Sequence, residues 1–111
     1  MKKIKLAISG CMGRMGQQLI KSSYKDKNFQ LAGLTENKPI NKKINGIELD
    51  LNNEKAFKRS DVIIDFTVPK CTLEILKIAT KLKKKVVIGT TGFTRKEENL
   101  IKNYSKKITI L

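Results

Sequence analysis

Three evenly spaced glycines near the N-terminus constrain the fold more than any other feature of the sequence. They are separated by two residues each and are Gly10, Gly13 and Gly16. The preceding residues 3–9 alternate in polarity, with Ile4, Leu6 and Ile8 on one face, which predicts a β-strand. Apolar residues at helical spacing over 15–24 predict an α-helix immediately afterwards. A strand that passes through glycines directly into a helix typically opens a β-α-β unit, so the sequence predicts an α/β fold.

A glycine turn in this position suits the binding of a pyrophosphate, because backbone N–H groups can point at the phosphates without an obstructing side chain. Gly10 would allow the sharp turn, Gly13 the approach of backbone to phosphate, and Gly16 close packing of the helix on the sheet. The helix N-terminus adds partial positive charge, and the Arg14 guanidinium either lies near the phosphates or is solvated. The predicted cofactor contacts are Gly10, Cys11, Met12, Gly13, Arg14, Met15 and Gly16.

A glutamate follows the glycines at the distance that a dinucleotide site requires. Glu36 comes 20 residues after Gly16, at the end of a second predicted strand over residues 29–35. A carboxylate there can accept hydrogen bonds from both hydroxyls of the adenosine ribose, whereas the alternative is a surface glutamate at a strand end. Because a carboxylate repels a 2′-phosphate, Glu36 favours NADH, and the nearby Lys38 leaves the use of NADPH open.

The rest of the sequence continues the alternation of strands and helices. Residues 61–66 and 85–89 are nearly continuous apolar runs, as expected for strands buried on both faces of a parallel sheet. Other predicted elements are a polar loop over 37–53 with a short strand near 47–49, helices over 54–59, 72–83 and 94–104, and a last strand over 108–111. We expect one domain over residues 1–111, with a truncated Rossmann-type parallel sheet that carries helices on both faces.

Two later segments should lie on the ligand side of this sheet, where the carboxyl ends of parallel strands meet. One is Asp65, Phe66 and Thr67 at the end of a strand, and the other is the glycine turn over 89–93 at the end of the next strand. Both have plainer alternatives. The turn could be an ordinary one before a helix, and Asp65 could be a buried, hydrogen-bonded carboxylate that fixes its loop.

Charge and composition exclude several other functions. The formal net charge is +14, which would indicate a nucleic-acid binder if the basic residues were clustered and interleaved with aromatic residues. They are instead almost all lysine and are scattered over predicted surfaces, so we expect no specific nucleic-acid partner. The sequence has no histidine, which removes imidazole acid–base chemistry and most zinc sites. We therefore predict no metal site in this chain.

Cysteine usage and hydropathy indicate a cytoplasmic protein. Cys11 and Cys71 are far apart in sequence and form no C-x-x-C pair, as expected for two reduced thiols. No apolar run approaches the roughly 18 residues that a membrane-spanning helix needs, so we expect no membrane association. No small-residue cleavage site follows the basic start of the chain, which argues against a secretory signal.

Four segments of the sequence together resemble one family. They are SGCMGRMGQQLI, the LTE that ends at Glu36, DVIIDFTVP and VVIGTTGF, and the resemblance that they carry extends over essentially all of residues 3–111. In this order and spacing they are similar to 4-hydroxy-tetrahydrodipicolinate reductase of the diaminopimelate and lysine pathway. The resemblance implies that the glycine loop holds the pyrophosphate of the cofactor and that Glu36 binds its adenosine ribose. It places five further contacts at the cofactor, with the last three at the nicotinamide end: Phe66, Thr67, Gly89, Thr90 and Thr91.

The resemblance also implies an NAD(P)H-dependent reductase that acts on a small dicarboxylate and forms a homotetramer. Members of that family continue into a substrate-binding and tetramer-forming domain with a catalytic histidine and lysine, whereas this sequence ends at Leu111. We therefore expect no catalytic residue in this chain and no turnover of substrate by the isolated chain. Asn37 stands where some members have an arginine that contacts the NADP phosphate. The alternatives are a stand-alone nucleotide-binding module without catalysis and, less favoured, a nonspecific nucleic-acid binder.

Overall fold

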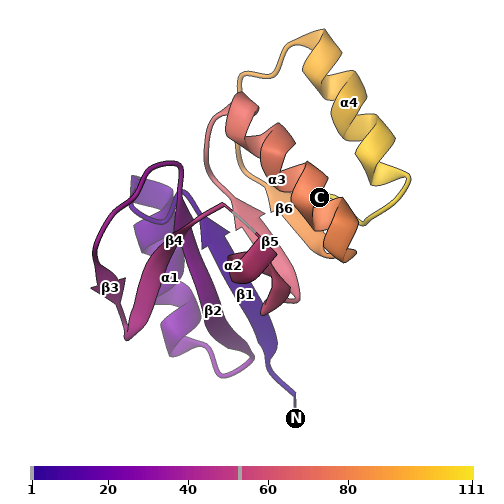
Figure 1. The fold of residues 1–111 in the computed structure, drawn as a ribbon. Helices are drawn as coiled ribbons and strands as arrows, with labels where there is room; N and C mark the ends of the chain where they lie inside the picture. Colours follow the sequence, from indigo (N-terminus) through magenta and orange to yellow (C-terminus); the bar gives the residue numbers. More distant parts are fainter. Residues whose placement is uncertain (1, 53) are drawn as a thin grey trace.

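The computed structural model describes residues 2–52 and 54–111, which form a sheet and four helices (Figure 1). The strands are β1 (Ile4–Ser9), β2 (Phe29–Glu36), β3 (Lys43–Ile44), β4 (Ile47–Leu51), β5 (Val62–Asp65) and β6 (Lys85–Ile88). The helices are α1 (Arg14–Lys25), α2 (Glu54–Lys58), α3 (Pro69–Leu82) and α4 (Arg95–Ser105).

The strands join one sheet in the order β3-β4-β2-β1-β5-β6. β1 pairs parallel with both β2 and β5, and the sheet continues in parallel to β4 on one side and to β6 on the other. The chain therefore adds β2 and the β3–β4 pair on one side of β1, and then crosses back to add β5 and β6 on the other side. This reversal creates a switch point between the carboxyl ends of β1 and β5, where open α/β sheets bind their ligands. The predicted Rossmann-type α/β fold is confirmed.

Two hydrophobic cores lie on opposite faces of the sheet. On one face α1 packs over β1 and β2, with Ile8 and Leu34 buried beneath it. On the other face α2 and α3 cover the sheet and bury Phe57, Ile63 and Leu76 completely. Figure 1 shows α4 alongside α3, at the side of the molecule that lies away from α1. The prediction of helices on both faces is confirmed.

A β-hairpin extends the sheet beyond the prediction. The sequence pattern predicts only a short strand near 47–49, whereas β4 pairs in parallel with β2 as a full member of the sheet. β3 and β4 are joined by Asn45 and Gly46, whose φ angles are 52° and 79°. Asn-Gly is the strongest two-residue hairpin signal because both positions need a positive φ. The hairpin places β4 next to the end of β2, with Asp50 in register with Thr35.

β5 and β6 are covered more fully on one face than on the other. Ile63 and Val86 are buried, whereas Val62, Ile64 and Val87 are only half-buried. The prediction that these strands are buried on both faces is therefore wrong for the face that carries α1. Because α1 packs mainly on β1 and β2, the half-buried side chains line an apolar groove of about 370 Å³.

Local signals explain where two helices begin. α4 follows Thr94, whose hydroxyl accepts the Glu97 N–H at 3.2 Å, while the Glu97 carboxylate accepts the Thr94 N–H at 2.8 Å. This is the predicted capping box. α3 begins at Pro69, three residues before the predicted start, because proline suits the first helical turn. The predicted last strand is reduced to a parallel bridge between Ile110 and Val86 at the edge of the sheet.

Candidate dinucleotide-binding site

The turn after β1 depends on Gly10 for two separate reasons. Its φ is +78°, which L side chains rarely adopt, and the N–H groups of Gly10 and Cys11 donate to the Thr35 carbonyl at 3.0 and 3.3 Å. A Cβ at residue 10 would also lie 2.2 Å from the carbonyl oxygen of Phe66. The sharp turn therefore brings three strand ends together, those of β1, β2 and β5.

Gly16 allows close packing at the start of α1. A Cβ at this position would lie 2.2 Å from the Gly10 carbonyl oxygen and 2.8 Å from the Cα of Cys11. The first turn of α1 therefore packs directly against the backbone of the glycine turn that follows β1. The same Gly10 carbonyl also accepts the Gly13 N–H at 3.0 Å.

Gly13 lies at the open side of the turn. A Cβ there would meet the Gly10 carbonyl oxygen at 3.3 Å and, among the described residues, nothing else within 4 Å. Gly13 is the N-cap of α1 and accepts the Gln17 N–H at 3.0 Å. The N–H groups of residues 14–16 precede this first helical hydrogen bond, so helix geometry gives them no acceptor within α1. The N-terminus of α1 thus offers N–H donors and a partial positive charge to an anion.

Glu36 lies against the glycine turn. Its Oε2 accepts the backbone N–H of Met12 at 2.7 Å, and its side chain is half-buried at the end of β2. A cavity of about 190 Å³ opens here, lined by Gly10, Gly13, Glu36, Asn37, Phe66, Thr67 and Val68. The structure thus brings the carboxylate and the glycine turn, which are far apart in the sequence, to one concave surface at the switch point.

Asp65 fixes the loop between β5 and α3. It is completely buried, and its Oδ1 accepts the Thr67 N–H at 3.1 Å and the Thr67 hydroxyl at 2.5 Å. Its Oδ2 accepts the hydroxyl of Thr72, which is also completely buried. These contacts match the alternative in which Asp65 is a hydrogen-bonded carboxylate that holds its loop. Phe66 and Thr67 are thereby placed at the edge of the cavity.

The turn after β6 lies beside the same loop. The Gly89 N–H donates to the Asp65 carbonyl at 2.7 Å, and the Thr90 hydroxyl accepts the Thr67 N–H at 2.9 Å. A Cβ at Gly89 would lie 2.1 Å from Cε1 of the Phe66 ring, so the ring occupies the space that a side chain would need. Thr90 is buried, whereas Thr91 is exposed. The structure therefore brings Gly89, Thr90 and Thr91 next to the β5–α3 loop.

The side chains of the glycine segment point in different directions. Cys11 is completely buried, and Met12 packs partly against the core below α1. Arg14 and Met15 are exposed at the start of α1. Cys11 therefore offers no exposed surface to a ligand in the cavity, whereas the exposed Arg14 guanidinium is free to approach a phosphate.

Burial, together with the negative charge of Glu36, raises the pKa of the Cys11 thiol to about 11. The folded chain therefore holds this proton more tightly than the unfolded chain, in which the thiol has its ordinary pKa of 9.0. The resulting stabilisation is present below pH 9 and is lost as the pH rises from 9 to 11. We expect the free energy of unfolding to fall over this range more steeply in the wild-type chain than in Cys11→Ala, as measured by urea unfolding. Equal slopes in the two proteins would contradict this assignment.

One residue of the site region was missed by the sequence analysis. The Oδ1 of Asn52, which follows β4, accepts the hydroxyls of Ser9 at 2.6 Å and Thr35 at 2.5 Å. Ser9 and Thr35 immediately precede Gly10 and Glu36 in the sequence. The available signal was weak, because it consists only of a small hydroxyl residue near the end of each of two strands.

Two further structural findings concern ions and membranes. Within residues 2–52 and 54–111, no group of three or more acidic, cysteine or histidine side chains is arranged to hold a metal ion. In the same part of the chain, no helix has both the length and the apolar character needed to cross a membrane.

The sheet order, the glycine turn at the switch point and the carboxylate at the end of β2 define a Rossmann-type nucleotide-binding domain. Comparison with known families makes this more specific. Residues 4–111 match the family described as dihydrodipicolinate reductase, N-terminus. The chain belongs to this family and corresponds to its N-terminal part.

Individual relatives agree with this placement. The chain is 74% identical over 111 residues to the 4-hydroxy-tetrahydrodipicolinate reductase of Pelagibacter ubique (strain HTCC1062), covering 100% of this chain and 43% of the relative. It is 42% identical over 123 residues to that of Buchnera aphidicola subsp. Acyrthosiphon pisum (strain 5A), covering 99% and 45%. The chain thus spans less than half the length of these curated relatives.

A solved structure shares the fold. The dipicolinate-bound dihydrodipicolinate reductase from Paenisporosarcina sp. TG-14 superimposes with a TM-score of 0.76 at 23% identity. The match covers 94% of this chain and 43% of that structure. At this level of identity the likeness establishes the shared architecture.

Proposed function

We propose that residues 1–111 are the nicotinamide-dinucleotide-binding domain of a 4-hydroxy-tetrahydrodipicolinate reductase. The observation that carries the proposal is the position of Glu36. Its carboxylate is 2.7 Å from the Met12 nitrogen, at the same cavity as the N-terminus of α1. A ribose recognised by the carboxylate and a pyrophosphate recognised by the helix can therefore belong to one ligand. Membership of the reductase family supports the same assignment.

The described residues fit the three parts of such a cofactor. Within the segment 10–16, the N–H groups of residues 14–16 would hold the pyrophosphate, because those of residues 10–13 already donate within the chain. Gly13 would lie at the open side of the turn, where the backbone can approach the phosphates. Glu36 would accept the hydroxyls of the adenosine ribose, and Phe66 and Thr67 would border the cofactor beyond it. The turn of Gly89, Thr90 and Thr91 would lie at the nicotinamide end. The bound cofactor supplies a hydride for reduction of the substrate ring, and the chain binds and orients the cofactor.

The site favours NADH over NADPH in this proposal. The Glu36 carboxylate carries a negative charge where a 2′-phosphate would lie, and the next residue, Asn37, is neutral. Lys38 is exposed close by and offsets part of this repulsion, so NADPH binds more weakly rather than not at all. The preference is thus assigned to the charge of one side chain.

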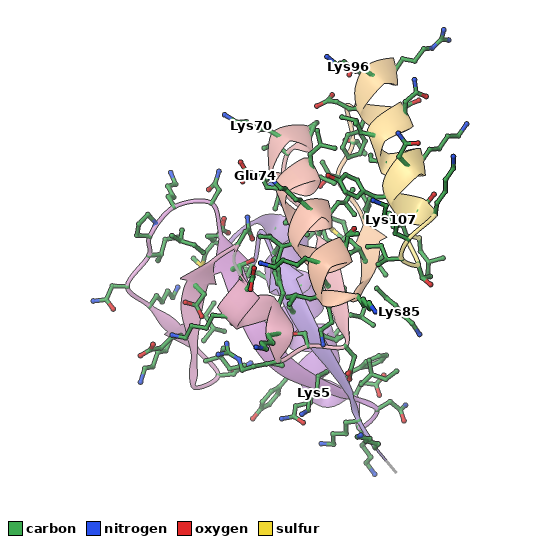
Figure 2. All side chains as sticks on the ribbon, turned by 45° about the vertical axis from the view of Figure 1, so that its right-hand side comes forward. Lys5, Lys70, Glu74, Lys85, Lys96 and Lys107 are labelled. Carbon is green, nitrogen blue, oxygen red and sulfur yellow. The ribbon has the colours of Figure 1, made fainter. Side chains whose placement is uncertain are left out.

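The proposed partners follow from the same assignment. The longer protein would act on a small dicarboxylate in the cytoplasm as a homotetramer, as the family resemblance implies. We propose no specific nucleic-acid partner, because the exposed lysines do not form one stripe. Figure 2 shows Lys5, Lys70 and Lys96 projecting from separate parts of the surface, on β1, α3 and α4. Their summed positive charge would attract an anionic cofactor.

Glu36→Ala is expected to weaken NADH binding by about 10- to 100-fold, since hydrogen bonds to a charged group are lost. Glu36→Gln should reduce the preference for NADH over NADPH, because an amide can still accept the Met12 N–H but no longer repels a 2′-phosphate. Fluorescence titration of each variant with both cofactors measures the effect. Glu48→Gln is the control, because Glu48 is an exposed glutamate on β4. Unchanged NADH affinity in Glu36→Ala would refute the ribose assignment.

A further inference from the structure

Asn52 joins the ends of two strands through a single oxygen atom. Its Oδ1 accepts hydrogen bonds from the Ser9 hydroxyl at 2.6 Å and the Thr35 hydroxyl at 2.5 Å. Ser9 and Thr35 are paired in register on β1 and β2, and both are completely buried. An amide oxygen has two lone pairs, so it can satisfy both hydroxyls at once. Without this acceptor, two buried donors would lose their partner, which is costly away from water.

Both hydroxyls belong to residues that directly precede the dinucleotide site. Ser9 is followed by Gly10, where the glycine turn begins, and Thr35 is followed by Glu36. Thr35 is connected to the turn a second time, because its carbonyl accepts the N–H groups of Gly10 and Cys11. A shift of Thr35 would therefore move the carboxylate and the glycine turn relative to each other.

We propose that Asn52 is a positioning residue for the dinucleotide site, which sets the separation between Glu36 and the glycine turn. The inference rests on the proposed function for its consequence in cofactor binding, but its structural part does not require a cofactor. Asn52 comes after β4 and before α2, outside the two segments that it aligns. The segment after β4 thus holds the two halves of the site in register, one at β1 and one at β2.

The hydrogen bond from Met12 to Glu36 reports this alignment directly. It spans the glycine turn and the end of β2, at 2.7 Å, and it is separate from the contacts of Asn52. If Asn52 only stabilised the fold, its loss would affect exchange of many amides together. If it positions the site, the Met12 amide should respond more than amides elsewhere in the sheet.

The test compares Asn52→Ala with Asn52→Asp. We expect Asn52→Ala to speed hydrogen exchange at the Met12 amide and to weaken NADH binding, each by about tenfold. Exchange at Val87, in β6 on the other side of the switch point, should stay unchanged. Asn52→Asp should restore both properties, because a carboxylate also accepts two hydroxyl donors. Asn41→Ala is the control, since Asn41 is an exposed asparagine in the preceding loop.

A second variant tests the pathway through the hydroxyls. In a Ser9→Ala, Thr35→Val background the donors are absent, so Asn52→Ala should add no further effect on Met12 exchange. An additional effect there, or unchanged Met12 exchange in Asn52→Ala itself, would overturn the proposal. If the wild-type chain binds no NADH while Met12 exchange still responds to Asn52→Ala, the proposed function fails and the positioning role stands.

Discussion

Gly13→Val is expected to abolish NADH binding while leaving the fold in place. Gly13 has φ −71° and ψ 168°, an extended conformation that valine adopts readily. Its Cβ would meet the Gly10 carbonyl oxygen at 3.3 Å and otherwise extend toward the cavity, where a phosphate would lie. We expect the Kd for NADH to rise at least about 100-fold, which corresponds to roughly 2.7 kcal/mol. Fluorescence titration measures binding, and thermal unfolding followed by circular dichroism checks the fold.

The other two glycines of the turn provide the contrast. An alanine at Gly16 would place its Cβ 2.2 Å from the Gly10 carbonyl oxygen. An alanine at Gly10 would have to adopt a positive φ and would also clash with the Phe66 carbonyl oxygen. Both substitutions should therefore destabilise the fold itself, by about 2 kcal/mol or more. Wild-type NADH affinity in Gly13→Val would show that the cofactor does not lie against this turn. Unfolding of Gly13→Val would show that this glycine is structural.

Asp65→Ala should be the most destabilising substitution of a polar residue in this chain. The carboxylate accepts the Thr67 N–H, the Thr67 hydroxyl and the Thr72 hydroxyl. Its removal leaves the completely buried Thr72 hydroxyl without this acceptor and releases the loop after β5. We expect the free energy of unfolding to fall by about 3 kcal/mol, as measured by urea unfolding.

Two companion variants separate the contributions. Asp65→Asn keeps one acceptor oxygen and should lose about half as much stability as Asp65→Ala. Thr72→Val removes the buried donor together with its need for a partner, so it should cost less than Asp65→Ala. A loss below about 0.5 kcal/mol in Asp65→Ala would mean that these hydrogen bonds contribute little to folding.

Local signals in the sequence were sufficient to predict the order of the strands and helices. Gly10 follows an alternating strand and precedes a helix, and Thr94 with Glu97 marks the start of α4. Each of these patterns depends only on residues that are close together in the sequence. Glu36 could also be placed, because its 20-residue distance from Gly16 reflects the length of a helix and a strand. The Asn45-Gly46 turn carried an equally strong local signal, and the predicted loop overlooked it.

Features that depend on long-range packing could not be predicted in this way. Asn52 meets Ser9 across 43 residues, and no periodicity connects the two positions. The apolar runs of β5 and β6 indicate buried strands, but hydrophobicity alone does not say which helix covers each face. Val62 and Ile64 are therefore less buried than predicted. Asp65 had two interpretations because an acidic residue at a strand end can either bind a ligand or hold a loop.

Phe66 limits which residues can replace two glycines that are far apart in the sequence, Gly10 and Gly89. Its carbonyl oxygen occupies the space beside Gly10, and its ring occupies the space beside Gly89. A side chain at position 89 becomes compatible when the ring is replaced by something smaller, so positions 66 and 89 can change as a pair. No replacement at position 66 makes room at position 10, because the obstacle there is backbone. A second substitution at position 66 can thus accommodate a side chain at position 89, but it cannot accommodate one at position 10.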